Sequence, residues 1–410
     1  MTWLTAPAHH RWLEAESDRL LEFGAASVDP TGGFGWLDEA GERVENHDIE
    51  LWITCRMTHC YSLATMMGRP GAAALADHGL DALRGRLRDD EHGGWFAAVG
   101  ADGPTNPAKQ AYGHAFVILA AASATAAGRP EARELLDEAV AVHTERFWDD
   151  DAGMSREEFA RDWSGEVDYR GINANMHTVE AYLAAADVTG DKALLQRALR
   201  ITERAVHRYA RGHQWRLPEH FDAHWEPVLS YNEDAPAHPF RPYGATVGHW
   251  FEWARLTLQL AASLQQSGLA HPEWMRDDAS ALYDAGVREG WSVDGATGFV
   301  YTVDWDGRPV VRERMHWVAA EAIGAAAVLW QVTRQPVYAE QYQRWWDYVG
   351  EHHLDREGGS WWHELGPSNR VSRTVWEGKA DIYHALQATL IPRLPTSPAL
   401  AASLAAGNLR

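Results

Sequence analysis

The chain has 410 residues, of which 46% are hydrophobic and 23% are charged, a balance typical of a soluble globular protein. Its formal net charge of −21 argues against nucleic acid and anionic membrane surfaces as partners, because both carry charge of the same sign. The two cysteines lack a CxxC spacing, which excludes a zinc ribbon or a CxxC redox motif and indicates reduced, buried thiols in a cytoplasmic protein.

The N-terminal part of the chain predicts a helix rather than a targeting signal. The stretch MTWLTAPAHHRWLEAESDRLLEFGAA carries charges where a signal peptide needs an apolar core. Further on, AFVILAAASATAA is too short and too rich in Ser and Thr to span a bilayer, so it indicates a helix buried on most sides. We therefore expect no membrane partner.

One loop pattern recurs along the chain. It consists of an acidic residue, a Gly-rich turn and an aromatic residue, and the copies begin at Asp29, Asp89, Asp149, Val293 and Asp355. The wider gap between the third and fourth copies leaves room for a degenerate copy near RGHQWRLPEHF. A spacing of about 60 residues predicts a repeat architecture.

Between these loops lie helical stretches of two kinds. ARELLDEAVAVHTERFW and KALLQRALRITERAVHRYA are amphipathic, whereas HTVEAYLAAADVTG and HWFEWARLTLQLAASL are apolar almost all round. Pairs of this kind must stack to bury their apolar faces. The sequence predicts an all-α fold, an (α/α)6 barrel formed by one domain over residues 1–410, with short β-hairpins in loops such as GFVYTVDWDGRPV.

Three buried segments each place a histidine and a carboxylate three residues apart, one turn of helix. The pairs are His177 with Glu180, His249 with Glu252, and His384 with Asp381. A carboxylate beside an imidazole can fix its tautomer and raise its basicity. One such pair could be structural, but three in otherwise apolar segments favour a shared pocket.

Other polar groups lie on the predicted inner helices. The segment TVWEGKADIYHALQ, expected to begin a buried helix, adds Trp376 and also Lys379, which we expect to pair with Asp381 or Glu377. Further candidates are Arg56, His59, Tyr112, His114, His316, Trp317 and Glu321. There are also 21 tryptophans, which suit both core packing and stacking on sugar rings.

No motif in the sequence requires a metal or a nucleotide. HExxH, cysteine ligands and phosphate-binding glycine loops are all absent. Imidazoles held by carboxylates are what metal-free proton transfer needs, because their pKa lies near neutral pH. We therefore expect no metal and no cofactor.

Four segments together resemble the N-acylglucosamine 2-epimerase superfamily. They are CRMTHCYSLA, NANMHTVEAYL, GHWFEWARL and TVWEGKADIYHALQA, and the similarity runs in register from about Arg56 to His384. Within the superfamily, the chain is most similar to the bacterial aldose–ketose isomerases that act on mannose. The resemblance implies an (α/α)6 barrel that interconverts D-mannose and D-fructose, and also D-lyxose and D-xylulose, through a cis-enediol without a metal. The expected partner is a monosaccharide, and the expected state is a monomer or weak homo-oligomer.

The resemblance also implies roles for individual residues. His384 would move the proton between C1 and C2, and His249 would serve ring opening and proton traffic at the oxygens. His177 resembles a third pocket histidine, and Asp381 would orient His384. The residues expected to line the sugar subsite are Arg56, Tyr112, Asn173, Glu180, Glu252, Trp317, Glu321, Trp376 and Asp381.

Several alternative functions remain open from the residues. A sugar 2-epimerase of the cellobiose or N-acylglucosamine type shares the enediolate and differs only in where the proton returns, and a sulfosugar isomerase is another relative. A glycoside hydrolase would use two carboxylates among Glu180, Glu252, Glu321 and Asp381 but would leave the histidines without a task. A non-enzymatic sugar-binding protein would explain the tryptophans but not the paired histidines.

Overall fold

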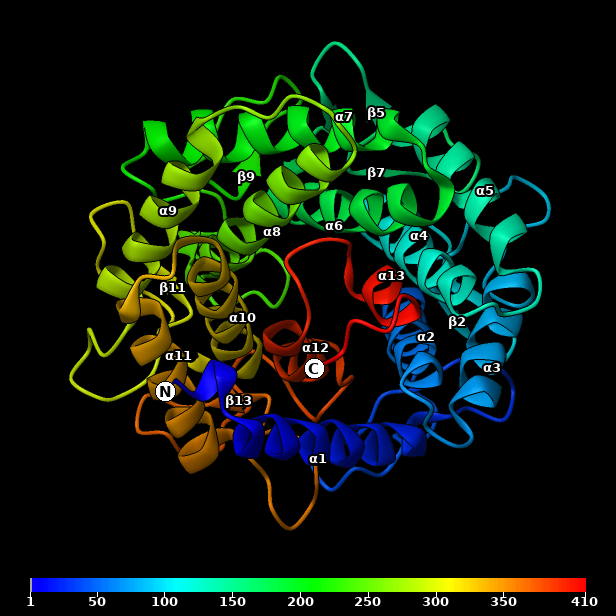
Figure 1. Cartoon of the computed structure of the whole chain (residues 1–410). Coiled ribbons are helices and arrows are strands. Elements are labelled where there is room, and N and C mark those ends of the chain that lie inside the picture. Colours follow the sequence, from blue (N-terminus) through cyan, green and yellow to red (C-terminus); the bar gives the residue numbers. More distant parts are fainter. Residues whose placement is uncertain (1) are drawn as a thin grey trace.

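The computed structural model describes residues 2–410 and is a ring of paired helices around a central axis (Figure 1). The inner helices are α2 (Leu51–Met66), α4 (Ala111–Ala126), α6 (Ile172–Thr189), α8 (Val247–Gln266), α10 (His316–Thr333) and α12 (Tyr383–Leu390). The outer helices are α1 (Pro7–Gly24), α3 (Ala72–Arg84), α5 (Ala132–Val142), α7 (Lys192–Thr202), α9 (Trp274–Gly290) and α11 (Pro336–Tyr348). This is the predicted (α/α)6 barrel.

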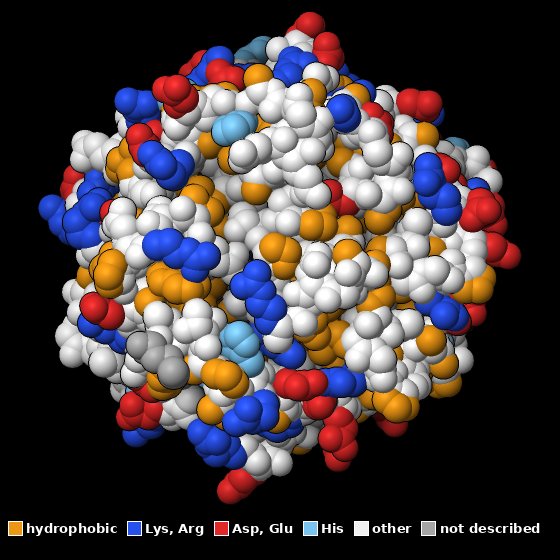
Figure 2. Space-filling view, in the orientation of Figure 1, with side chains coloured by type: hydrophobic (Ala, Val, Ile, Leu, Met, Phe, Trp, Pro, Cys, Tyr) orange, Lys and Arg blue, Asp and Glu red, His pale blue; other side chains and the backbone are white. Residues whose placement is uncertain are grey.

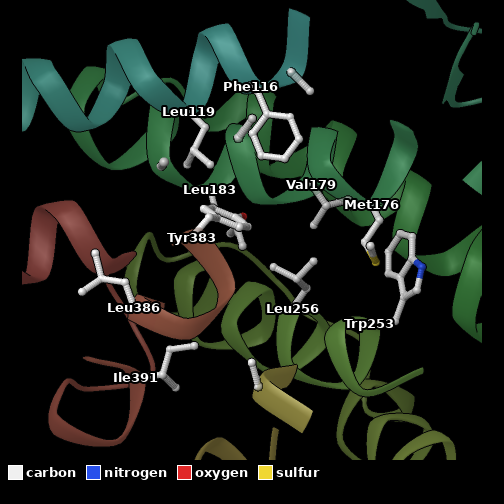
Figure 3. Close-up of a cluster of buried hydrophobic side chains, with 14 of the residues drawn as sticks. Phe116, Leu119, Met176, Val179, Leu183, Trp253, Leu256, Tyr383, Leu386 and Ile391 are labelled. Atoms are coloured by element: carbon white, nitrogen blue, oxygen red, sulfur yellow. The ribbon is translucent and has the colours of Figure 1, made fainter. Parts of the chain in front are cut away.

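The two rings follow from the two kinds of helical pattern. In α4 and α10 almost every residue is buried, because these helices meet neighbours on all sides. In α7 the buried residues Leu194, Leu195, Ala198 and Ile201 recur at helical spacing, so only one face packs inward. Figure 3 shows side chains of α4, α6, α8 and α12 meeting at the axis, where they fill the barrel. The exterior of the molecule differs from this core. Figure 2 shows charged side chains of both signs around the rim and hydrophobic ones scattered between them.

Shorter elements extend and close the ring. Three outer helices continue into π-helical turns, which are η3 (His143–Phe147), η4 (Glu203–Ala210) and η5 (Val349–His353). Single 3₁₀ turns are η1 (Trp3–Thr5), η2 (Ala25–Ser27) and η6 (Ile391–Arg393). The last helix, α13 (Leu400–Ala405), packs against α2, α4 and α6.

Short strands fasten each repeat to the next one. Five inner helices are preceded by a two-residue strand that pairs, antiparallel, with a strand of the following loop. The pairs are β1 (Ile49–Glu50) with β2 (Ala98–Gly100), β4 (Lys109–Gln110) with β7 (Glu158–Phe159), β8 (Arg170–Gly171) with β9 (His220–Phe221), β10 (Ala245–Thr246) with β11 (Thr302–Val303), and β12 (Arg314–Met315) with β13 (Glu364–Leu365). In addition, β3 (Gly103–Asn106) pairs with β2, and β5 (Trp148–Asp149) pairs with β6 (Met154–Ser155).

The recurring acidic–glycine–aromatic loops all follow an outer helix and lead to an inner one. The five recognisable copies are closed by antiparallel bridges, which are Val28 with Phe34, Arg88 with Trp95, Trp148 with Ser155, Trp291 with Phe299, and Leu354 with Trp361. The degenerate copy turns instead through Gln214 and Trp215, both with positive φ. The hairpin expected at GFVYTVDWDGRPV is also present, since Val303 pairs with Pro309.

The acidic residue of each loop has a structural task. Asp355 Oδ1 accepts the backbone N–H groups of Glu357 (3.1 Å) and Gly358 (2.9 Å), which stabilises the turn. Its Oδ2 lies 2.5 Å from Nζ of Lys379, which precedes α12 in the chain. Equivalent ion pairs join Asp89 to Lys109 (2.8 Å) and Asp294 to Arg314 (2.7 Å), in front of α4 and α10.

Two predictions for the segment Thr374–Gln387 are wrong. The helix begins only at Tyr383: Gly378 has a φ of +71°, which a right-handed helix does not contain, and Ile382, directly before the helix, has a φ of −112°. Lys379 pairs with Asp355 rather than with Asp381 or Glu377, because the loop carries its side chain back toward the preceding turn.

Two expectations from composition can be compared with the described residues. Cys55 and Cys60 are both free and buried. Over residues 2–410, none of the helices is both long enough and apolar enough to cross a membrane.

Candidate active site

The N-terminal ends of the six inner helices converge on one cleft with about 730 Å³ of empty space, including its mouth. The second residue of most inner helices, or the third in α8, lines this cleft. These residues are Trp52, Tyr112, Asn173, His249, Trp317 and His384. Because helix N-termini carry partial positive charge, their convergence favours negative charge in the cleft.

A second layer of side chains lies one turn deeper. Four inner helices repeat the same i, i+4 spacing, which places Arg56 below Trp52, Phe116 below Tyr112, His177 below Asn173 and Glu321 below Trp317. In α8 the deeper residue is Glu252. Further along the same helices, apolar side chains such as Leu119, Leu183 and Leu256 form the barrel core (Figure 3).

His384 is held by a carboxylate, but not by the one predicted. Its Nδ1 lies 2.9 Å from Glu321 Oε1 on α10. Since an ionised carboxylate can only accept, Nδ1 carries the proton and Nε2 keeps a free lone pair. Burial lowers the pKa of His384, and the hydrogen bond to Glu321 opposes that shift.

Asp381 binds Arg56 rather than His384. It precedes the helix instead of sharing a helical face with His384, so its Oδ1 accepts the backbone N–H of Tyr383 (2.8 Å). Its Oδ2 accepts a hydrogen bond from Arg56 Nη1 (3.0 Å). Burial alone would raise the pKa of Asp381, but the Arg56 charge holds it below its ordinary value.

His249 is also held by a carboxylate that the sequence spacing did not indicate. Its Nδ1 lies 2.8 Å from Glu219 Oε2, and Glu219 precedes β9. The predicted partner, Glu252, lies one turn deeper and accepts a hydrogen bond from Arg255. Glu219 belongs to the degenerate loop copy, and aligning its PEHF with the REEF around Glu157 would have identified it as an equivalent position.

The third predicted pair, His177 with Glu180, is present. His177 Nδ1 lies 3.2 Å from Glu180 Oε2. Burial lowers the pKa of His177 to about 4, against the raising influence of Glu180. This imidazole is therefore neutral at neutral pH, with its Nε2 lone pair free.

Arg255, which the sequence reasoning did not single out, occupies the centre of the deeper layer. It donates to Glu321 Oε2 (2.9 Å), Glu252 Oε1 (3.2 Å) and Gln259 Oε1 (3.1 Å). Burial and the neighbouring Glu321 charge raise the pKa of Glu252 well above its ordinary value. Burial would also raise the pKa of Glu321, but Arg255 and His384 lower it. Of these two carboxyl groups, Glu252 therefore holds a proton more readily than Glu321.

Arg56 is enclosed by aromatic rings. Its guanidinium carbon lies 5.0 Å from the Trp52 ring centroid and 4.7 Å from those of Phe116 and Tyr383. A second hydrogen bond joins Nη2 to Tyr112 Oη (3.0 Å). Arg56 is thus a fixed positive charge on the cleft wall.

Aromatic side chains surround the mouth of the cleft. Phe240, on the long connection between β9 and β10, lies 5.1 Å from Trp376, 5.9 Å from Trp52 and 6.1 Å from Tyr112, measured between ring centroids. Glu364 accepts hydrogen bonds from three successive backbone N–H groups, Thr374, Val375 and Trp376, which fixes the Trp376 segment. Neither Phe240 nor Glu364 had a recognisable sequence signal.

Two groups of side chains have the composition of a metal site. The ligand atoms of His177, Glu180 and Glu252 lie within 4.8 Å of one another, as do those of Glu252, Glu321 and His384. Both groups share Glu252, and Arg255 already donates to Glu252 and Glu321. The guanidinium therefore supplies the positive charge that a cation would bring.

Ten of the twelve predicted site residues line the cleft, and the other two, Glu180 and Glu321, support His177 and His384 from behind. Among the weaker histidine candidates, His316 lines the cleft, whereas His59 bonds Ser123 (2.7 Å) and His114 bonds the Gln110 carbonyl (2.8 Å).

Comparisons with known proteins agree with this architecture. Residues 32–388 match the model of the N-acylglucosamine 2-epimerase (GlcNAc 2-epimerase) family. The chain is 53% identical to a D-mannose isomerase of Thermobifida fusca, over 98% of each protein. It is 50% identical to a D-mannose isomerase of Pseudomonas cannabina pv. alisalensis, over 98% of this chain and 97% of that one. A crystal structure of D-mannose isomerase superposes with a TM-score of 0.86 at 28% identity, covering 94% of this chain and 98% of that one.

Proposed function

Because the chain belongs to the N-acylglucosamine 2-epimerase family, a family of sugar isomerases and epimerases, we propose that it is an aldose–ketose isomerase that interconverts D-mannose and D-fructose. D-Lyxose and D-xylulose would react by the same route, since D-lyxose is D-mannose without C6. The close similarity to two D-mannose isomerases supports this substrate over those of a 2-epimerase.

The observation that carries the proposal is a pair of histidines on either side of one tryptophan. The Trp317 ring centroid lies 5.3 Å from that of His249 and 5.7 Å from that of His384. Each imidazole has Nδ1 held by a carboxylate, so each can present a basic Nε2 to a sugar lying between them. Two imidazoles in one cleft, each held by a carboxylate, suit proton transfer at both carbon and oxygen.

In the proposed reaction, D-mannose reacts in its linear aldehyde form, and His384 Nε2 removes the proton from C2. The electron pair of that bond forms the C1=C2 double bond and leaves the negative charge on O1, giving the cis-enediolate. His249 Nε2 then accepts the O2 proton and delivers it to O1, and His384 returns its proton to C1 as the electron pair on O2 forms the C2 carbonyl, which yields D-fructose. No atom or electron is gained or lost overall.

The surroundings favour the charge that develops on the sugar oxygens. The positive Arg56 and the six converging helix N-termini stabilise an enediolate. Burial raises the pKa of Glu252, whose Oε2 has no partner within residues 2–410, so in its protonated form this carboxyl group can donate a hydrogen bond. A glycoside hydrolase needs one carboxylic acid and one ionised carboxylate that both reach the substrate, and it is less well served because Glu321 and Asp381 are both engaged by arginines.

The mouth of the cleft supports a monosaccharide substrate. Phe240 packs against Trp376 and Trp52 at the opening, so the second ring of a disaccharide would have to displace it. This argues against an epimerase of the cellobiose type.

The test is a sugar screen with product identification by NMR. Incubation with D-mannose should give D-fructose, and incubation with cellobiose or N-acetylglucosamine should give no reaction. Formation of D-glucose as the main product from D-mannose would identify a 2-epimerase, and release of monosaccharides from a disaccharide would identify a hydrolase.

A further inference from the structure

Tyr383 stands directly before His384, yet it does not belong to the cleft lining. It is the first residue of α12 and is completely buried. Figure 3 shows its ring among apolar side chains that include Leu119, Leu183 and Leu256. A hydroxyl group in such a place must find a partner, because an unpaired buried donor is costly.

The partner of the Tyr383 hydroxyl is Glu180 on α6. The hydroxyl donates to Oε2, the same oxygen that accepts from His177 Nδ1 (3.2 Å). The other oxygen, Oε1, accepts from Gln387 Nε2 (3.1 Å). Burial raises the pKa of Tyr383 well above its ordinary value, so the hydroxyl stays protonated and remains a donor.

These contacts connect both sides of the cleft. On one side, Tyr383 is covalently joined to His384, and its backbone N–H is fixed by Asp381. On the other side, its hydroxyl fixes the carboxylate that sets the tautomer of His177. Its ring also lies 4.7 Å below the Arg56 guanidinium.

We propose that Tyr383 is a positioning residue: its hydroxyl, acting through Glu180, holds His177, which lines the cleft, in a single orientation and tautomer toward the bound sugar. The catalytic part of this inference rests on the proposed function, whereas the effect on His177 does not. Tyr383 itself touches no substrate.

The matched perturbation is Tyr383→Phe, which removes only the hydroxyl and keeps the ring beneath Arg56. We expect kcat for D-mannose to fall about 10-fold with KM changed less than threefold, since a charge-assisted hydrogen bond behind a histidine of the cleft is lost. The control is Tyr182→Phe on the same helix as Glu180, because Tyr182 is also fully buried and bonds a histidine, His143 (2.9 Å), outside the cleft. The control should keep kcat within twofold of the wild type.

A double-mutant cycle tests whether the hydroxyl acts through Glu180. Glu180→Gln should lower kcat by at least as much as Tyr383→Phe, and the double variant should stay within threefold of Glu180→Gln alone. A further 10-fold loss in the double variant would show independent effects and overturn the inference. An unchanged kcat in Tyr383→Phe would overturn it too.

A readout without substrate separates this inference from the proposed reaction. In protein labelled with ¹⁵N-histidine, the His177 signals are assigned by their loss in His177→Gln. The wild type should show one tautomer with the proton on Nδ1, and Tyr383→Phe should show a mixture of tautomers. An identical spectrum in both proteins would refute the positioning role even if isomerase activity is found, and a change in tautomer would support it even if the substrate is another sugar.

Discussion

Glu219 offers a sharp test of how the cleft holds His249. Its Oε2 accepts the only hydrogen bond that the His249 ring makes within residues 2–410, at 2.8 Å from Nδ1, and Glu219 is only 4% exposed. We propose the substitution Glu219→Gln, which keeps the size and one hydrogen-bonding oxygen but removes the charge.

The expected magnitude follows from that hydrogen bond. A bond to a charged group contributes about 1.5–3 kcal/mol, and a bond between neutral groups contributes about 0.5–1.5 kcal/mol. The difference, about 1–1.5 kcal/mol, applies mainly when His249 becomes protonated during the reaction. Since about 1.4 kcal/mol is a factor of ten in rate, kcat should fall about 5- to 12-fold.

The assay is the initial rate of ketose formation from D-mannose, with kcat and KM measured separately. The repeat supplies a matched control, because Glu157 occupies the equivalent position one unit earlier. Glu157 accepts a hydrogen bond from the Gly171 N–H (3.1 Å) and contacts no cleft histidine. Glu157→Gln should therefore leave kcat within twofold of the wild type.

Two results would refute this reasoning. The first is a Glu219→Gln variant with kcat within twofold of the wild type, which would mean that the carboxylate does not support proton transfer. The second is an equal loss of activity in Glu157→Gln, which would point to a general effect on the fold. Thermal melting of both variants distinguishes a folded, slower enzyme from a destabilised one.

Four further predictions test the chemistry. His384→Ala should lower kcat by about 10²–10⁴-fold while circular dichroism and calorimetric sugar binding stay close to the wild type, and near-normal turnover would reject its role. Exhaustive chelation should leave activity unchanged, so a loss that Mn²⁺ or Co²⁺ restores would contradict the metal-free mechanism. Early-time D-fructose formed in D₂O should carry deuterium at one prochiral position of C1 by proton NMR, whereas an unlabelled C1 would point to a hydride shift. Because burial lowers the pKa of His384 from its ordinary 6.5, its basic form persists to lower pH, and the acid limb of kcat/KM should have its midpoint below 6.5; a midpoint above 7 would refute this.

The sequence by itself determined the fold class. Hydrophobic periodicity distinguishes α7, which buries one face, from α4, which is buried all round, and local composition is enough for that distinction. The recurring acidic–glycine–aromatic loops could be recognised because turn geometry depends on local residue types, and all five predicted copies close as bridged turns. The chemistry of the cleft could likewise be expected from imidazoles and carboxylates in apolar segments.

Only the tertiary structure decided which groups act together. The i, i+3 spacing correctly paired His177 with Glu180 but paired His249 and His384 with the wrong carboxylates. At the end of a helix, a side chain has neighbours on adjacent helices and strands as close as those on its own helix, and sequence spacing carries no information about them. Arg255 shows the same limit, since its partner Glu321 lies 66 residues away. The sequence thus indicated most of the polar groups that line the cleft, though not the aromatic Phe240, and the packing of separate helices and strands determined which of them meet.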